Sequence, residues 1–177
     1  ALIHALEYDD THIASVVHGS AFAAPLALAV AQLCNATGRD LIRAYILAWE
    51  VAIRIGMAGP GAFQAKGFQV TSVGGAIGAA AAASQILGLD RRQTISAIGI
   101  AGGQASGTLA VLADGAISKA LKPGWAARTG IEAARLAVAG MSGPESVLES
   151  RFGVMNAFGD GADNLDRHMA SLSDDWF

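Results

Sequence analysis

Apolar side chains recur every three or four residues over long parts of this chain, with polar side chains between them. The stretch 40–56 is the clearest case, because its charged residues Arg43, Glu50 and Arg54 fall outside the apolar positions. Those apolar positions are Leu41, Ala44, Tyr45, Ala48, Ala52 and Ile55. This spacing is typical of one face of an α-helix. No run of valine, isoleucine, threonine and aromatic residues alternates over more than a few positions, so strands are not expected.

Residues that start and stop helices divide the chain into helical pairs. The long helices are expected over 20–35, with Pro25 near the first turn and a stop at Gly38; over 40–56, capped by Asp40; over 71–87, stopped by Gly88; over 90–101, capped by Asp90; and over 125–139, between Pro123 and Gly140. Short helices are expected after Pro144 and over 165–172. The pattern predicts an all-α, multi-helix bundle of helical hairpins, with residues 1–177 in one helical domain.

One of these helices consists almost entirely of small residues. Residues 72–84 read SVGGAIGAAAAAS, and small side chains let neighbouring helix axes approach closely. We therefore expect this helix at the centre of the bundle. Its glycines loosely resemble a phosphate-binding loop, but no strand precedes them and no acidic residue follows at the required spacing, so a nucleotide site is not expected.

Composition and charge exclude several classes of partner. Only 15% of the residues are charged, the net charge is −3, and the basic residues are scattered rather than clustered. Nucleic acid is therefore not expected as a partner. The segments 11–38, 67–89 and 94–113 contain no charged residue, but alanine, glycine, serine and threonine dominate them, which favours buried helices over membrane spans. The single cysteine, Cys34, favours a reducing compartment, with the cytoplasm as the expected location.

The densest polar cluster lies near the beginning of the chain. Residues 4–12 read HALEYDDTH, and His18 and Ser20 follow shortly after. Carboxylates beside imidazoles can supply a general acid and a general base. Two alternatives remain open: the segment could simply cap a helix, with His4 packed in the core, or it could bind a metal. No His-x-x-x-His or His-x-Asp spacing with a matching third ligand supports the metal, so we expect none.

All three lysines lie in two further segments. Lys119 and Lys122 come just before the helix at 125–139, where helix N-terminal amides also favour anions. Lys66 precedes Gln69 and Thr71 at the head of the small-residue helix. Each combination suits a carboxylate ligand. The alternative for the first segment is an ordinary solvated loop.

Six segments resemble, in order, the motifs of a known family. They are 4–12 (HALEYDDTH, against H-x-L-D-[FY]-D-D-T-H), 18–20 (HGS, against H-P-S), 66–71 (KGFQVT, against G-[FWY]-H-x-T), 104–107 (QASG, against Q/N-x-S-G), 118–127 (SKALKPGWAA, against T-K-x-x-H-x-G-x-A-A) and 143–153 (GPESVLESRFG, against G-P-x-x-x-L-E-G-x-x-G). The chain thus resembles the MmgE/PrpD family over nearly its whole length. That family includes dehydratases, decarboxylases and epimerases of small carboxylic acids.

The resemblance implies the rest of the molecule and its mode of action. Such members have an all-helical large domain and a smaller α+β lid domain, dimerise through the helical part and use no cofactor. The chain would then be a fragment of a two-domain protein, with 172–177 beginning the connection to an absent lid. The implied reaction is removal of a proton next to a carboxylate of a small di- or tricarboxylate, as in 2-methylcitrate dehydratase. A catalytically degenerate module that dimerises or binds a carboxylate is the alternative.

The resemblance also implies the site residues. The catalytic positions fall on His18, Asp10 and Lys119, where His18 is the base or acid, Asp10 orients it or exchanges protons, and Lys119 neutralises substrate carboxylates. The substrate-binding positions fall on Thr11, Glu7, Gln69, Lys122 and Lys66. Three of them depart from the family pattern: Glu7 stands in place of Asp, while Gln69 and Lys122 each stand in place of His. A glutamine cannot transfer a proton at neutral pH, and a lysine is mostly charged unless it is buried, so two imidazole steps lack an obvious carrier.

Overall fold

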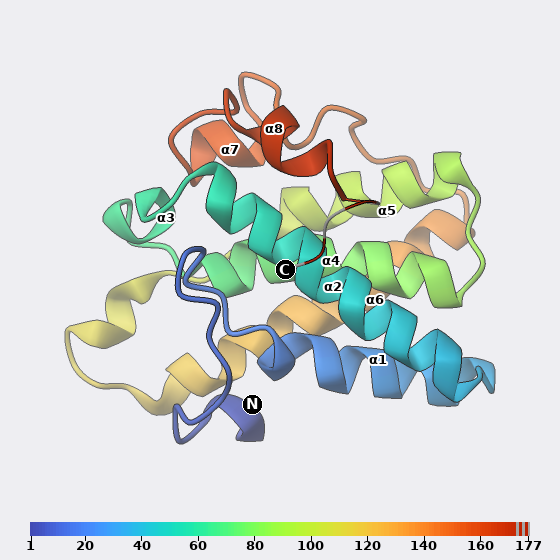
Figure 1. Cartoon of the computed structure of the whole chain (residues 1–177), viewed down its shortest axis with the longest axis horizontal. Helices are drawn as coiled ribbons and strands as arrows, with labels where there is room; N and C mark the ends of the chain where they lie inside the picture. Colours follow the sequence, from blue (N-terminus) through green and yellow to red (C-terminus); the bar gives the residue numbers. More distant parts are fainter. Residues whose placement is uncertain (173, 175, 177) are drawn as a thin grey trace.

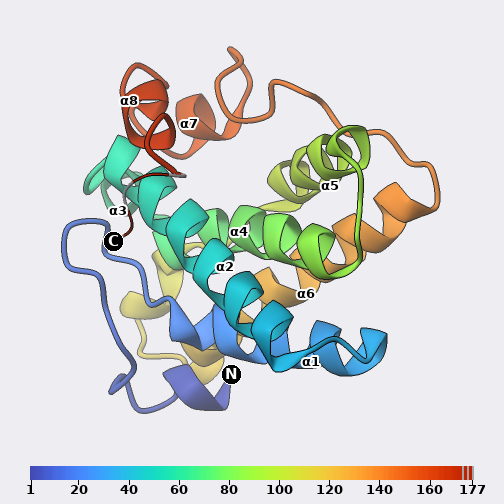
Figure 2. The ribbon, with the colours of Figure 1, turned by 45° about the vertical axis from the view of Figure 1, so that its right-hand side comes forward.

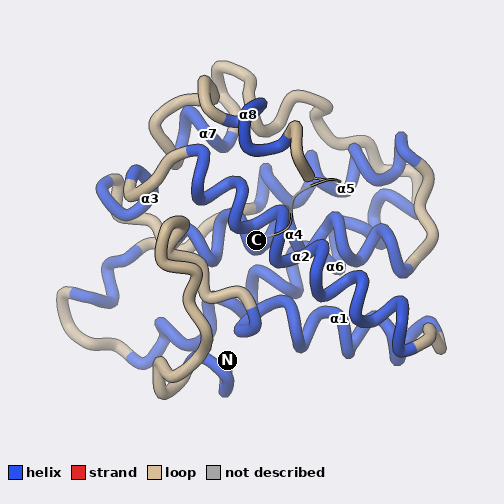
Figure 3. The backbone as a smooth tube through the Cα atoms, viewed as in Figure 1, coloured by secondary structure: helices blue, strands red, loops and turns tan. Residues whose placement is uncertain are grey.

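The computed structural model describes residues 1–172, 174 and 176, and in that part of the chain the regular structure is helical (Figures 1 and 3). The α-helices are α1 (Ser20–Cys34), α2 (Gly38–Ala58), α3 (Ala62–Ala65), α4 (Val70–Ile86), α5 (Arg91–Gln104), α6 (Lys122–Val138), α7 (Val154–Ala157) and α8 (Leu165–Met169). Three short 3-10 helices are η1 (Leu2–His4), η2 (Leu109–Leu112) and η3 (Ile117–Leu121). The all-α prediction is confirmed.

Helix α4 forms the centre of the bundle, as the small-residue pattern predicts. Every residue from 70 to 84 is buried, with α2, α5, α6 and α1 packed around them (Figure 2). The close packing depends on missing side chains. A Cβ atom on Gly78 would lie 2.5 Å from the carbonyl oxygen of Ala48 in α2, and one on Gly130 in α6 would lie 2.4 Å from the Cβ of Ala79. Both distances are too short for any side chain, so glycine sets the spacing of the three central helices.

The first hairpin, α1 with α2, begins at Ser20 as predicted, but its turn and both ends of α2 differ from the prediction. Asn35 ends α1 in the left-handed conformation (φ 49°), and Thr37 rather than Asp40 caps α2. The Thr37 hydroxyl accepts the Asp40 backbone N–H, while the Asp40 carboxylate accepts the Thr37 N–H, so the two share a capping box and α2 starts at Gly38. Pro25 lies inside α1, in its second turn rather than its first.

The other helices follow the predicted start and stop signals closely. Asp90 caps α5 in a capping box with Gln93, and Gly88 ends the preceding helix at φ 68°. Pro123 lies in the first turn of α6, and Gly140 follows that helix at φ 93°. The helix expected after Pro144 begins only at Val154, because 145–150 form turns. Part of the expected lid connection, 172–177, lies outside the described residues.

The first nineteen residues are mostly irregular, and several contacts fix them to the bundle. The backbone N–H of His18 donates to the Thr71 hydroxyl at 3.0 Å, next to the first residue of α4. Gly19 lies against the Trp49 indole, where a Cβ atom would come within 2.0 Å of the ring. Helix η1 also contacts η3 and α1. The polar cluster of the sequence is therefore held between the start of α4 and the segment before α6.

None of the helices in the described part of the chain has the length and apolar content needed to cross a lipid bilayer.

Candidate functional site

A cleft of about 550 Å³ opens between the N-terminal segment and the loops that precede α6. Its walls include His4, Glu7, Val111, Leu112, Ile117 and Lys119. Lys119 Nζ donates to Glu7 Oε1 at 2.5 Å across this cleft. Both side chains keep contact with solvent, because Lys119 is 25% exposed and Glu7 is 55% exposed. The cleft thus presents a cation and a carboxylate that a polar ligand can reach.

Local structure explains how Glu7 and Lys119 meet. Glu7 adopts the left-handed backbone conformation (φ 56°), which turns the chain sharply just after η1. Lys119 lies in η3, one turn before α6 begins. The hydrogen bond from Lys119 lowers the pKa of the Glu7 carboxyl most. Desolvation, the second-largest effect, opposes it, and the positive fields of Lys119, His4 and His18 lower the pKa further. Glu7 is therefore ionised at neutral pH.

His18 lies next to this cleft, with its side chain 19% exposed. Its Nδ1 atom is 3.0 Å from the Thr11 hydroxyl and 3.6 Å from Asp9 Oδ2. Burial lowers the pKa of the imidazole most, the positive fields of His4 and Lys119 add to this, and Asp9 and Glu7 oppose it. At neutral pH His18 is mainly the neutral imidazole, the form that can accept a proton.

Behind His18 lies a fully buried row of polar groups. His4 Nδ1 is 2.8 Å from Asp9 Oδ2, and the exposed fractions of these two side chains are 0% and 1%. On the other side, Gln69 Nε2 lies 3.3 Å from His4 Nε2, and the Gln69 carbonyl oxygen accepts from the Ser72 hydroxyl at 3.1 Å. The rings of His4 and His18 are 4.6 Å apart between centroids. Both ends of the Gln69 amide are thus in hydrogen bonds, and substrate binding by Gln69 stays a prediction.

Asp10 points to a different part of the molecule from its neighbour Asp9. Its carboxylate accepts the backbone N–H of Ser20 at 3.2 Å and the Ser20 hydroxyl at 2.6 Å, at the start of α1. The Tyr45 hydroxyl, 2.6 Å from the Ser20 hydroxyl, extends this network. The contact with His18 that the sequence pattern assigns to Asp10 therefore belongs to Asp9. Direct proton exchange by Asp10 stays a prediction.

The other two lysines bind backbone carbonyls. Lys66 is exposed and donates to the Asn156 carbonyl at 3.1 Å, so its ammonium group is directed to α7. Lys122 donates to the Thr108 carbonyl, and desolvation, with the nearby charge of Lys119, lowers the pKa of its ammonium group. Substrate binding by either lysine stays a prediction.

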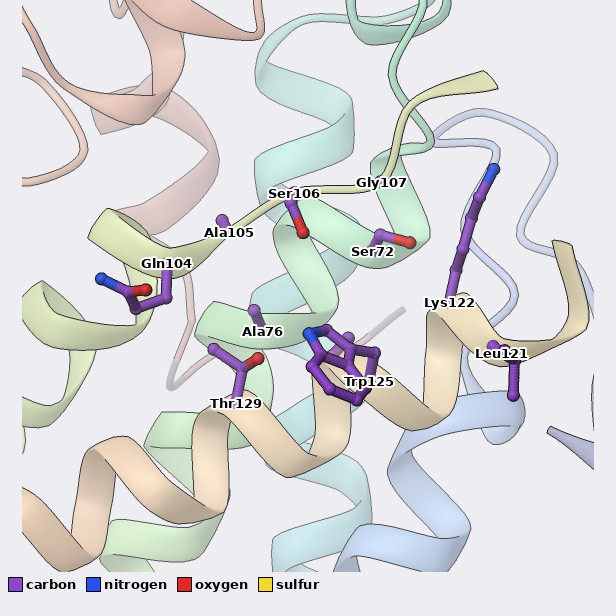
Figure 4. Close-up of a pocket in the computed structure, with 11 residues that line it drawn as sticks. Ser72, Ala76, Gln104, Ala105, Ser106, Gly107, Leu121, Lys122, Trp125 and Thr129 are labelled. Carbon is purple, nitrogen blue, oxygen red and sulfur yellow. The ribbon is translucent and has the colours of Figure 1, made fainter. Parts of the chain in front are cut away.

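Lys122 also borders a second, smaller cavity of about 190 Å³ beside α6. Figure 4 shows Trp125 and Thr129 on α6 with Ser106 from the segment after α5, while the Lys122 chain extends away from Trp125. Gly107 closes one side at φ 123°, where a Cβ atom would lie 2.5 Å from the Ser72 Cβ. The backbone of that segment also bonds to the turn before α4, from Gln69 N–H to the Gly107 carbonyl at 2.9 Å.

His4, Asp9 and His18 form the one group in the described part of the chain whose ligand atoms could hold a metal ion. Those atoms all lie within 4.8 Å of one another. Both ring nitrogens of His4 are already within hydrogen-bond distance of a partner, Asp9 or Gln69. The arrangement is accordingly that of a buried histidine–carboxylate pair, and the expectation of no metal stays a prediction.

Comparison with known proteins places this geometry in context. The family model of the MmgE/PrpD N-terminal domain matches residues 1–165. The chain belongs to the MmgE/PrpD family. Human cis-aconitate decarboxylase is 37% identical over 163 residues, and the cis-aconitate decarboxylase-like protein oryM of Aspergillus oryzae is 34% identical over 161 residues. These matches cover 88% and 86% of this chain and 33% of each relative, so the chain spans about a third of their length.

Three of the segments that carry MmgE/PrpD motifs meet at or beside the cleft. Glu7 from the first motif and Lys119 from the motif before α6 line it, while His18 from the second motif lies next to it with Asp9 and Thr11. Sequence reasoning missed His4 and Asp9 as site residues, although it noted both in the polar cluster. No sequence signal separates these two residues from the polar residues around them, because their burial becomes visible only with the fold.

Proposed function

We propose that this chain is the helical part of a cofactor-independent lyase or isomerase that acts on a small di- or tricarboxylate. The observation that carries the proposal is the pairing of Lys119 with Glu7 at one cleft, with the neutral His18 beside it. A cation there can neutralise a substrate carboxylate, and a neutral imidazole beside it can accept or return a proton at the adjacent carbon.

The chemical steps divide between these residues. When His18 removes a proton next to a carboxylate, the electron pair left on carbon passes into that carboxylate as an enediolate. The Lys119 ammonium stabilises the added negative charge, and Thr11 holds the imidazole at Nδ1. In a decarboxylation the same enediolate forms by loss of carbon dioxide, and it takes up a proton from His18. This reaction therefore needs an imidazole that has first taken a proton from solvent, so its rate depends on the protonated fraction of His18.

The relatives direct the choice of substrate. Those named cis-aconitate decarboxylase make decarboxylation of an unsaturated tricarboxylate the first reaction to test, ahead of the dehydration that the motifs alone favour. We include in the proposal a homodimer formed through the helical part. The exposed apolar side chains of Leu28, Leu33 and Ile42 on α1 and the first turns of α2 support it. A reducing compartment, with the cytoplasm expected, also remains part of the proposal.

The test uses the full-length protein that contains this chain. We expect one of two reactions, both measured by NMR. One is decarboxylation of cis-aconitate, and the other is exchange of solvent deuterium into the carbon next to a carboxylate of citrate-like acids. His18→Gln and Lys119→Ala should each reduce the rate at least about 100-fold, since a positioned acid–base group or charge contributes that much, while helicity is retained. Arg135→Ala, which removes an exposed cation paired with Glu132 on α6, is the control. Rates within threefold of the unchanged protein in both site variants would contradict the assignment.

A second candidate function is a module that binds a carboxylate without turning it over. The buried Gln69, at a position where the family pattern has histidine, favours it because an amide cannot carry a proton. Calorimetric binding of citrate or cis-aconitate, without deuterium exchange and without carbon dioxide release, is the result expected from this module.

A further inference from the structure

The buried polar row behind His18 has a definite direction of hydrogen bonding. The Ser72 hydroxyl donates to the Gln69 carbonyl oxygen, which fixes the Gln69 amide so that its NH₂ group faces His4 Nε2 at 3.3 Å. An amide NH₂ can only donate, so His4 Nε2 is the acceptor. The ring proton of neutral His4 therefore lies on Nδ1, which faces Asp9 Oδ2 at 2.8 Å. Gln69 thus selects the tautomer of His4 that holds the Asp9 carboxylate.

Asp9 in turn lies on the Nδ1 side of His18. Its Oδ2 atom is 3.6 Å from that nitrogen, and the Thr11 hydroxyl is 3.0 Å from it. These two contacts engage Nδ1 and leave Nε2 of His18 for a ligand. The other oxygen of Asp9, Oδ1, is buried without a hydrogen-bond partner in the structure. A carboxylate held in this way costs free energy to bury, and a positive charge developing on the neighbouring imidazole offsets that cost.

We propose that His4 and Asp9 are positioning residues for His18: Gln69 and His4 hold the Asp9 carboxylate, and Asp9 orients the imidazole and stabilises its protonated form. This proposal rests on the function proposed above for His18. It also gives the Gln69 substitution a role, because an amide at this place sets a tautomer rather than transferring a proton. Asp9 and His4 touch His18 and each other, so they act through His18.

The charged groups that face His18 define the expected effect of removing Asp9. They are His4 and Asp9 from the N-terminal segment, Glu7 from the same segment, and Lys119 from η3. Asp9 and Glu7 raise the pKa of His18, whereas His4 and Lys119 lower it. Loss of the Asp9 charge therefore lowers the pKa of His18 further. In deuterium exchange the neutral imidazole is the base, so the acid limb of the kcat/KM profile for exchange should move to lower pH in Asp9→Asn. In decarboxylation the protonated imidazole is the acid, so the alkaline limb should move to lower pH instead.

The experiment compares two adjacent carboxylates in the full-length protein. Asp9→Asn removes the charge beside His18, and Asp10→Asn removes the one that caps α1 at Ser20. Histidine-selective NMR titration reports the His18 pKa and the His4 tautomer with no need for turnover. In Asp9→Asn we expect the His18 pKa to fall, and kcat to fall at least about tenfold with KM little changed. In Asp10→Asn we expect lower thermal stability and an unmoved His18 pKa.

Two His4 variants test the second part of the proposal, that His4 holds the Asp9 carboxylate. The amide nitrogen of His4→Asn can occupy the place of Nδ1 and donate to Asp9, whereas His4→Leu cannot. We expect His4→Asn to keep most of kcat and His4→Leu to reduce kcat as Asp9→Asn does. In both His4 variants the His18 pKa should rise rather than fall, because the field of His4 that lowers it is lost. Glu132→Gln on the exposed face of α6 is the activity control.

Three results would overturn the proposal. One is an unchanged His18 pKa and acid limb in Asp9→Asn, which would make the pair merely structural. Another is a His4 tautomer with the proton on Nε2. The third is loss of activity on dialysis against a chelator with recovery on adding zinc or iron, which would make His4, Asp9 and His18 a metal site. If the unchanged protein turns over no carboxylate, the proposed function fails, while the NMR titration still decides whether Asp9 and His4 control His18.

Discussion

At the scale of single residues, Glu7 reaches Lys119 through an uncommon backbone conformation and a side chain one methylene longer than the aspartate of the family pattern. A residue other than glycine at φ 56° pays a conformational cost, and such positions are concentrated at functional sites. The ion pair with Lys119 contributes to holding the turn after η1 in place. Its contribution is small, because both groups remain in contact with water.

The pH dependence of stability tests that ion pair. The pKa of Glu7 is lower in the folded protein than its ordinary value of 4.5, so the pair stabilises the fold above pH 4.5. This stabilisation is lost as the pH falls through the lowered pKa. Glu7→Gln should therefore lower the Tm at pH 7 by the equivalent of less than about 1 kcal/mol, with the difference vanishing in strong acid. A Tm difference that stays constant across the acid range would argue against the pair.

At the scale of elements, the packing of α4 depends on positions where no side chain fits. We expect Gly78→Ala to destabilise the protein by about 1–3 kcal/mol, because its Cβ would lie 2.5 Å from a backbone oxygen of α2. Gly103→Ala in α5 is the matched control, since a Cβ there meets nothing within 4 Å and alanine favours helix by about 0.5–1 kcal/mol. Denaturant unfolding of both variants checks the prediction. Equal effects of the two substitutions would contradict the packing argument.

The helices could be predicted from the sequence because local signals determine them. Apolar spacing, the Asp90 cap and the glycine stops act within a few residues, so they are visible without the fold. The site could be predicted only in part. The pairing of Asp9 rather than Asp10 with His18 depends on the direction of the chain after the left-handed Glu7, which sequence spacing does not reveal. The contact of Lys66 with α7 likewise joins residues that lie far apart in the sequence.

At the scale of the whole molecule, one buried ion pair joins the last described helix to the bundle. Arg54 in α2 is fully buried and donates to Glu50 Oε2 at 3.1 Å. The same guanidinium donates to the His168 carbonyl and to the Ser171 hydroxyl at 3.0 Å, at and just beyond α8. A guanidinium has enough fixed donors to make all these bonds at once. Arg54 thus fixes α8 across α2.

Substitution of Arg54 should weaken the attachment of α8 to α2 before it affects the rest of the bundle. Arg54→Met removes this partner of a buried carboxylate, so we expect a loss of about 3–5 kcal/mol in unfolding free energy and faster hydrogen exchange over 165–171. The double variant Glu50→Leu with Arg54→Met should recover part of the stability, because no buried charge of the pair remains. A double variant as unstable as the single one would contradict this account.

The long sequence separation of the contacts around the cleft also bears on the order of folding. Glu7 and Lys119 lie 112 residues apart, and His18 and Thr71 lie 53 apart, whereas the hairpins α1–α2 and α4–α5 join neighbouring helices. Closing a long loop costs entropy before its contacts form, so local hairpins form sooner. The helical core can therefore be complete before Glu7 and Lys119 meet, and the first nineteen residues can detach locally while the core stays folded.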